Sequence, residues 1–221
     1  MRIGVLLSGC GYLDGSEIRE AVITLLAVDR SDAQATIMAP DLDVGSTNHL
    51  TKQPMKEKRN ILVEAARIPR GKIVDIQKIK ADDLDALILP GGFGAAKHLS
   101  NFASHGANAT VQGDVERLIK DVHRQGKPVG AICIAPSILA TIFGKEGVQV
   151  TIGNDAETAQ VLEQCGAKHH NRKAEEIEVD ERLRMVTTPA YMYDDERLGN
   201  IATGIEKLVH RIIGMAKATR M

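Results

Sequence analysis

Cys133 is the residue whose surroundings in the sequence favour covalent chemistry. It follows the apolar run of residues 129–132, and Pro136 opens the helical stretch that comes next. A turn between a buried strand and a helix aims its central side chain at the edge of a sheet, where the helix amides stabilise a thiolate. The alternative is an inert core cysteine, since free cysteine is among the most buried residue types. The spacing alone leaves both open.

A glycine-rich turn, "PGGFG", follows another apolar run and contains Gly91 and Gly92. Glycines let the backbone approach a ligand closely, so the N–H groups of this turn could bind an oxyanion opposite the cysteine. The alternative is a plain tight turn between a strand and a helix. The pattern is not the dinucleotide fingerprint, which requires G-x-G-x-x-G.

Glu17 is the candidate acid for such a site. It lies three residues after Asp14, a spacing typical of a capping box, so it either caps its own helix or donates a proton beside the thiol. His49 is a possible accessory residue in a long polar stretch. No histidine follows Cys133 before His169, so the sequence assigns no cysteine–histidine pair.

Strands and helices alternate along the chain. Apolar runs predict strands at residues 2–8, 34–40, 71–79, 84–90 and 127–133, with a further pair within residues 176–190. Helical patterns cover residues 15–30, 59–68, 111–125, 135–143, 154–165 and 197–217. In the first helix we expect a buried stripe of Ile18, Val22, Leu25 and Leu26, and in residues 41–58 an irregular excursion.

This order predicts an α/β fold with a mostly parallel sheet covered by helices on both faces, and one domain spanning residues 1–221. Ligands of such sheets bind beyond the carboxyl ends of the strands. Residues 9–17, the loop after Pro40, the glycine turn and Cys133 all fall at such ends, so we expect them to lie along one edge.

Composition excludes several classes of function. The net charge of −1 and the 3% aromatic content argue against a nucleic-acid partner, and no apolar run reaches the length of a membrane span. Three cysteines without metal-binding spacing predict neither a disulfide framework nor a metal site. The first residues do not resemble a signal peptide, so we expect a cytoplasmic protein with reduced thiols.

Seven stretches together give the chain a family resemblance: "GVLLSGCGYLDGSEIREAV", "NHLT", "RNILVEAARI", "LDALILPGGFGAAKHLSNFA", "GKPVGAICIAPSIL", "TIGNDAETAQVLEQCGA" and "VTTPAYM". They resemble the ElbB family of the class I glutamine amidotransferase-like superfamily, which also contains the PfpI-type proteins. The resemblance implies a flavodoxin-like three-layer sandwich with a cysteine on a nucleophile elbow. It also implies a cofactor-independent glyoxalase that converts glyoxal to glycolate, with activity that can reflect deglycation, and a link to isoprenoid biosynthesis.

The family's functional residues correspond to few positions here. The resemblance places the elbow nucleophile at Cys133, its acidic partner at Glu17 and the glycine turn at Gly91 and Gly92, with a second amide from Ile134. The stretch "VTIGND" lacks the histidine that PfpI-type proteins carry after the elbow helix. We therefore do not expect glutamine hydrolysis, because a poor amine leaving group needs a general acid.

Two other classes of function stay open. A reactive Cys133 with Cys10 as a resolving thiol would make a redox sensor, because exposed low-pKa cysteines oxidise readily. A metabolite-binding protein without turnover is the other alternative. The expected partner is a small aldehyde, and the expected assembly is a homodimer, the commonest form of soluble oligomer.

Overall fold

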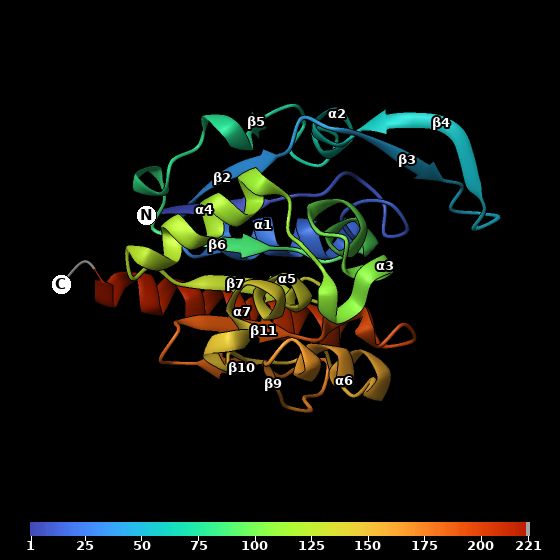
Figure 1. Ribbon diagram of the computed structural model, residues 1–221. Helices are drawn as coiled ribbons and strands as arrows, with labels where there is room; N and C mark the ends of the chain where they lie inside the picture. The colour runs from blue at the N-terminus through green and yellow to red at the C-terminus, as the bar shows by residue number, and fades with distance from the viewer. Residues whose placement is uncertain (220–221) are drawn as a thin grey trace.

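A seven-stranded sheet forms the centre of the molecule (Figure 1). The computed structural model describes residues 1–219. The strand order is β10-β11-β7-β6-β1-β2-β5, and every pair is parallel except the antiparallel β10–β11. The strands are β1 (Arg2–Leu6), β2 (Gln34–Ala39), β5 (Val74–Asp75), β6 (Ala86–Leu89), β7 (Val129–Ile132), β10 (Glu178–Asp180) and β11 (Met185–Thr188). The predicted α/β fold with a mostly parallel sheet is confirmed.

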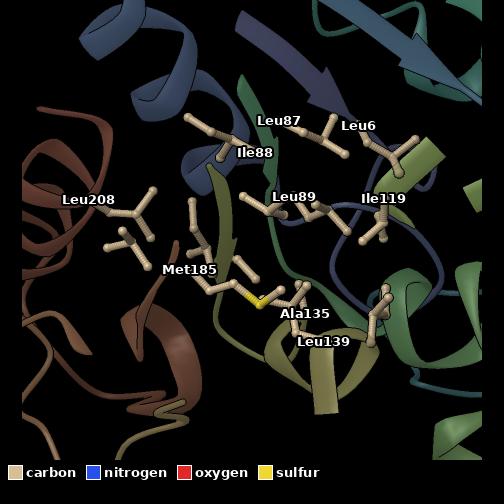
Figure 2. Close-up of a cluster of buried hydrophobic side chains, with 14 of the residues drawn as sticks. Leu6, Leu87, Ile88, Leu89, Ile119, Ala135, Leu139, Met185 and Leu208 are labelled. Atoms are coloured by element: carbon tan, nitrogen blue, oxygen red, sulfur yellow. The ribbon is translucent and has the colours of Figure 1, made fainter. Parts of the chain in front are cut away.

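Helices cover both faces of this sheet. Helices α1 (Ile18–Arg30) and α7 (Leu198–Thr219) pack together on one face, and α4 (Gly113–Arg124) and α5 (Pro136–Phe143) lie on the other. Figure 2 shows Leu208 of α7 and Ile119 of α4 on opposite sides of the central strands, with Leu89 between them. All three side chains are fully buried. The three layers are those of the expected sandwich.

Helix α1 buries a different face from the one predicted. Its buried residues are Glu20, Ala21, Thr24, Ala27 and Val28. The predicted stripe is wrong, since Ile18, Val22 and Leu26 are 42–48% exposed and Leu25 is half-buried. Helix α1 lies directly against α7 and β2, so small side chains face inward and the larger ones remain outside.

Residues 41–58 do not form the irregular excursion predicted. They contain most of an antiparallel hairpin of β3 (Asp43–Thr47) and β4 (Pro54–Asn60), which projects from the body in Figure 1. The hairpin residues are mostly polar and at least partly exposed, and Ser46 is the one buried residue in its two strands. The hairpin therefore lacks the alternation of apolar and polar residues by which a half-buried strand is recognised in a sequence.

Shorter elements complete the described chain. They include α2 (Ile61–Ala65), α3 (Phe102–His105), α6 (Ala156–Gln164), β8 (Gln149–Val150) and β9 (Lys168–His169). Helix α6 is capped by Asp155, whose side chain accepts from the Thr158 amide, and it ends before Gly166 at φ +95°. The strand predicted at residues 71–79 shortens to β5, followed by a 3-10 turn. Within residues 1–219 no helix combines the length and apolarity needed to cross a bilayer.

Candidate active site

Cys133 lies on the turn between β7 and α5 in a strained backbone conformation. Its φ is +61°, in the left-handed region that residues with a Cβ rarely adopt. Its backbone N–H donates to the Thr188 carbonyl at 2.9 Å, and Pro136 begins the following helix. The side chain is 7% exposed and forms part of the floor of an open cleft. Strain of this kind recurs at functional sites, where the surrounding structure holds it in place.

The glycine turn meets the cysteine as the sequence suggests. The backbone N–H groups of Gly92 and Ile134 hydrogen-bond the Cys133 sulfur and lower the pKa of the thiol. A Cβ on Gly91 would collide with the Cβ of Cys133 and lie 2.7 Å from Glu20 Oε2. Glycine is required at this position because the backbone lies directly against the thiol.

The carboxyl group in contact with Cys133 belongs to Glu20. This side chain is fully buried and hydrogen-bonds the cysteine. Its Oε2 accepts from the Gly91 amide at 2.9 Å, and its Oε1 accepts from the Tyr191 amide at 3.2 Å. Glu20 is thus fixed between the glycine turn, the elbow and the segment after β11.

Burial controls the protonation of this pair. Desolvation, followed by the negative charge of Glu17, raises the pKa of Glu20 to about 8, against the lowering effects of the two amides and of the hydrogen bond to Cys133. Desolvation also raises the pKa of the Cys133 thiol well above its usual value, and the charge of Glu20 adds to this. The expectation of a resting thiolate is wrong, because the helix amides do not offset burial.

The pair therefore has a defined route to a nucleophile. At pH 7 both groups are mostly protonated, and as the pH rises through about 8 they come to share one proton. In that state the carboxylate can accept the thiol proton, and the resulting carboxylic acid can donate a hydrogen bond back to the sulfur. Glu20 is placed to act as general base and then as general acid.

Glu17, the acid expected from the sequence, lies beside this pair, but the carboxyl in contact with Cys133 is that of Glu20. Glu17 is the N-cap of α1: its Oε2 accepts from the Glu20 amide at 2.7 Å, while its Oε1 accepts from Arg19 Nε at 3.0 Å. The predicted capping box is wrong, because the side chain of Asp14 accepts instead from the Thr47 amide of the hairpin. Glu17 caps its helix and also lines the cleft.

The cleft above Cys133 has a volume of about 830 Å³. Its wall contains aromatic and apolar side chains, including Tyr12, Phe93 and Tyr191, together with charged ones. Its remaining charged residues are Arg19, Lys52, Asp155, Glu157, Asp194 and Asp195. The cleft is far larger than a two-carbon aldehyde.

The two accessory residues lie outside this cleft. Cys10 borders a separate small cavity under the hairpin, so the structure does not bring it to Cys133 as a resolving thiol. His49 Nε2 accepts from the Leu13 amide at 3.3 Å, and His49 Nδ1 lies 3.1 Å from the Thr47 carbonyl. The histidine therefore ties the hairpin to the loop that forms one wall of the cleft.

Within residues 1–219, no histidine lines the cleft. His169 accepts from the Ile152 amide and His170 contacts Glu178, both beside a different cavity near α6. Nor do the described residues contain a group of three His, Cys, Asp or Glu arranged to bind a metal ion. Around Cys133 the structure brings together a thiol, the buried carboxyl of Glu20, the carboxyl of Glu17 at the cleft surface, and backbone amides.

Comparison with known proteins gives this site a family context. The sequence pattern described as the DJ-1/PfpI family matches residues 11–194. The chain is 42% identical to human "Glutamine amidotransferase-like class 1 domain-containing protein 3, mitochondrial", over 96% of this chain and 82% of that protein. It is 41% identical to the rat "ES1 protein homolog, mitochondrial", over 96% and 83% of the two chains.

Solved structures agree with these sequence matches. A crystal structure from Ehrlichia chaffeensis, described as an isoprenoid biosynthesis protein with an amidotransferase-like domain, superimposes with a TM-score of 0.90 at 32% identity. The alignment covers 97% of this chain and 99% of that one. A DJ-1 variant from Schizosaccharomyces pombe superimposes with a TM-score of 0.58 at 17% identity, which shows the shared fold.

One expectation from the sequence is overturned by these relatives. The human and rat proteins are both named as mitochondrial, which contradicts the cytoplasmic placement predicted from the N-terminal residues and the cysteine content. The amino-acid composition does not identify the cellular compartment, because reduced thiols and a balanced net charge are not confined to one compartment.

Proposed function

Because the chain belongs to the DJ-1/PfpI family, we propose that it is a cofactor-independent glyoxalase that converts glyoxal to glycolate through a covalent adduct on Cys133. Within that family we place it with the ElbB-type proteins. The observation that carries the proposal is the buried carboxyl of Glu20 against the elbow thiol. A carboxyl whose pKa is raised to about 8 can both remove and return protons near neutral pH.

The first step is addition of the thiol to one aldehyde carbon of glyoxal. Glu20 accepts the proton of Cys133 as the sulfur–carbon bond forms, and the carbonyl π electrons move to oxygen. The amides of Gly92 and Ile134 already point at the sulfur and can stabilise the developing alkoxide. Protonation of that oxygen gives a hemithioacetal, and no leaving group is expelled.

The second step is an internal redox exchange between adjacent carbons. The sulfur-bearing carbon loses its proton to a base, and the resulting enediol regains a proton on the neighbouring carbon. One carbon is thereby oxidised to a thioester and the other is reduced to an alcohol. Water then hydrolyses the thioester to glycolate and restores the thiol, so that glyoxal plus water gives glycolate without an external oxidant.

Glutamine hydrolysis is not part of the proposal. Amide cleavage must protonate an amine leaving group, and a histidine beside the nucleophile normally does this. No histidine lines the cleft within residues 1–219, whereas an aldehyde makes no such demand. The description of the Ehrlichia relative supports a link to isoprenoid biosynthesis, which we extend to this chain as part of the proposal.

The test is to incubate the purified protein separately with glyoxal and with glutamine, measuring glycolate and ammonia. We expect glycolate that disappears in Cys133→Ala, and no ammonia above background. Cys165→Ala is the matched control, because Cys165 ends α6 and does not line the cleft. Ammonia that depends on Cys133, or glycolate that persists in Cys133→Ala, would overturn the proposal.

A further inference from the structure

Arg19 occupies an unfavourable place in helix α1. It lies in the first turn, where the positive end of the helix dipole disfavours a cation. Its side chain is 55% exposed, so burial of apolar surface does not explain its position. Contacts with Glu17 and Tyr191 hold it there. Its Nε donates to Glu17 Oε1 at 3.0 Å, and its guanidinium carbon lies 4.1 Å from the centre of the Tyr191 ring.

Both partners of Arg19 also hold Glu20. Glu17 Oε2 accepts from the backbone amide of Glu20 at 2.7 Å, and the backbone amide of Tyr191 donates to the Glu20 carboxyl at 3.2 Å. The four residues therefore form a closed ring of contacts. One half of the ring fixes the backbone of Glu20, and the other half fixes its carboxyl.

The Tyr191 side of this ring is a short turn after β11. Ala190, which begins the 3-10 segment Ala190–Met192, has a φ of +44°, in the region that favours glycine. A strained turn keeps its conformation only when neighbouring contacts hold it. The stacking of Arg19 on Tyr191 is such a contact, and it joins this turn to the N-terminus of α1.

We propose that Arg19 is a positioning residue, which holds the carboxyl of Glu20 against the Cys133 thiol by binding Glu17 and stacking on Tyr191. This inference rests on the proposed reaction at Cys133. Its test does not require turnover, because the proximity of the carboxyl and the thiol is reported by the pH dependence of cysteine alkylation.

The titrating groups around Glu20 allow two roles of Arg19 to be separated. Glu17, Arg19 and Tyr191 face it from α1 and the turn after β11, and Cys133 faces it from the elbow. If Arg19 only balanced the charge of Glu17, its removal would raise the pKa of Glu20 further. If Arg19 holds the carboxyl in its buried place, its removal lets the carboxyl move toward solvent, and the pKa falls.

The experiment measures iodoacetamide labelling of Cys133 against pH, with glyoxal turnover on the same samples. For Arg19→Gln we expect the labelling inflection to move below pH 8, and kcat at pH 7 to fall about tenfold with KM nearly unchanged. Tyr191→Ala should behave alike. Tyr191→Phe keeps the ring and the backbone amide and should move the inflection less than Tyr191→Ala, and Arg19→Lys should keep part of the wild-type behaviour.

The results that would overturn the inference are specific. An inflection that rises or stays in place in both Arg19→Gln and Tyr191→Ala would leave Arg19 without a positioning role. Equal effects of Tyr191→Phe and Tyr191→Ala would exclude stacking of Arg19 on the Tyr191 ring as the contact that positions Glu20. If Arg19→Gln does not fold, Arg19→Lys and Tyr191→Ala decide the question by the same criteria. A wild-type protein that labels as expected but turns over no glyoxal would refute the proposed function and leave this inference standing.

Discussion

Glu20 is the residue on which the account of the site depends, because its carboxyl is buried against the nucleophile. We expect Glu20→Gln to lower glyoxal turnover about 10²–10⁴-fold, the usual scale for a positioned acid–base group. Glu17→Gln should cost less than about tenfold, because glutamine still accepts the capping hydrogen bond. Steady-state kinetics of both variants, with thermal melting as the control for folding, make the comparison. Equal losses in the two would contradict the assignment of the proton transfer to Glu20 alone.

The protonation of the Cys133–Glu20 pair gives a second prediction at this scale. Since the pKa of Glu20 is raised to about 8, labelling of Cys133 by iodoacetamide should accelerate as the pH rises through 8. The Glu20→Gln variant should lose this inflection, because no carboxylate remains to accept the thiol proton. A wild-type profile that is flat between pH 6 and 9 would contradict the shared-proton account.

The sequence predicted part of this site for local reasons. Cys133, Gly91, Gly92 and Ile134 all lie on turns that directly follow buried strands, so a short stretch of sequence is enough to place them. Glu20 was missed because its position depends on which face of α1 is buried, and that face is set by packing against α7. The sequence feature that could have identified Glu20 is a lone carboxylate on the same helical face as the small residues of α1.

At the scale of elements, the hairpin β3–β4 supports one wall of the cleft. Because its sequence is polar, the hydrophobic pattern did not predict it. Asp14 and His49 tie it to the loop that carries Tyr12 and Leu13. Other elements followed from periodicity alone, including the long C-terminal helix α7. Strongly periodic elements were predicted well, whereas exposed ones depend on contacts that are distant in the sequence.

We expect His49→Ala to loosen this wall and raise the KM for glyoxal several-fold while changing kcat little. The reason is that His49 supports Leu13 in the wall and does not itself line the cleft. The matched control is Leu50→Ser, because Leu50 is 95% exposed on the same loop and should be neutral. A large fall in kcat in His49→Ala would instead place the histidine in the chemistry.

At the scale of the whole molecule, the raised pKa of Glu20 couples the active site to stability. Between pH 4.5 and 8 the folded state holds one more proton at Glu20 than the unfolded state, so the free energy of unfolding falls as the pH rises. At about 1.4 kcal/mol per pKa unit, the loss amounts to up to about 5 kcal/mol. Removal of the carboxyl abolishes this dependence.

Urea unfolding of the wild type and of Glu20→Gln at pH 5 and pH 8.5 measures the effect. We expect the wild type to lose several kcal/mol relative to the variant between these two pH values. Subtracting the change in the free energy of unfolding of the variant from that of the wild type removes the contribution of the other titrating groups. A constant difference across the range would show that Glu20 has an ordinary pKa in the folded protein.

The expected homodimer stays a proposal at this scale. The exposed apolar residues Ile18, Val22 and Leu26 recur every four residues along α1, and a second copy that covered them would bury a continuous stripe. We expect sedimentation equilibrium to show a dimer, and Val22→Glu to weaken it about tenfold or more. A monomer at micromolar concentration would refute the proposal.

The central claim is that glyoxal becomes glycolate while attached to Cys133. The most direct measurement is rapid quenching of the protein with glyoxal, followed by mass spectrometry of the peptide that contains Cys133. The account predicts an adduct of one glyoxal on Cys133 that forms and decays at the rate at which glycolate appears, and that forms more slowly in Glu20→Gln. Glycolate produced without this adduct, or an adduct that persists without glycolate, would contradict it.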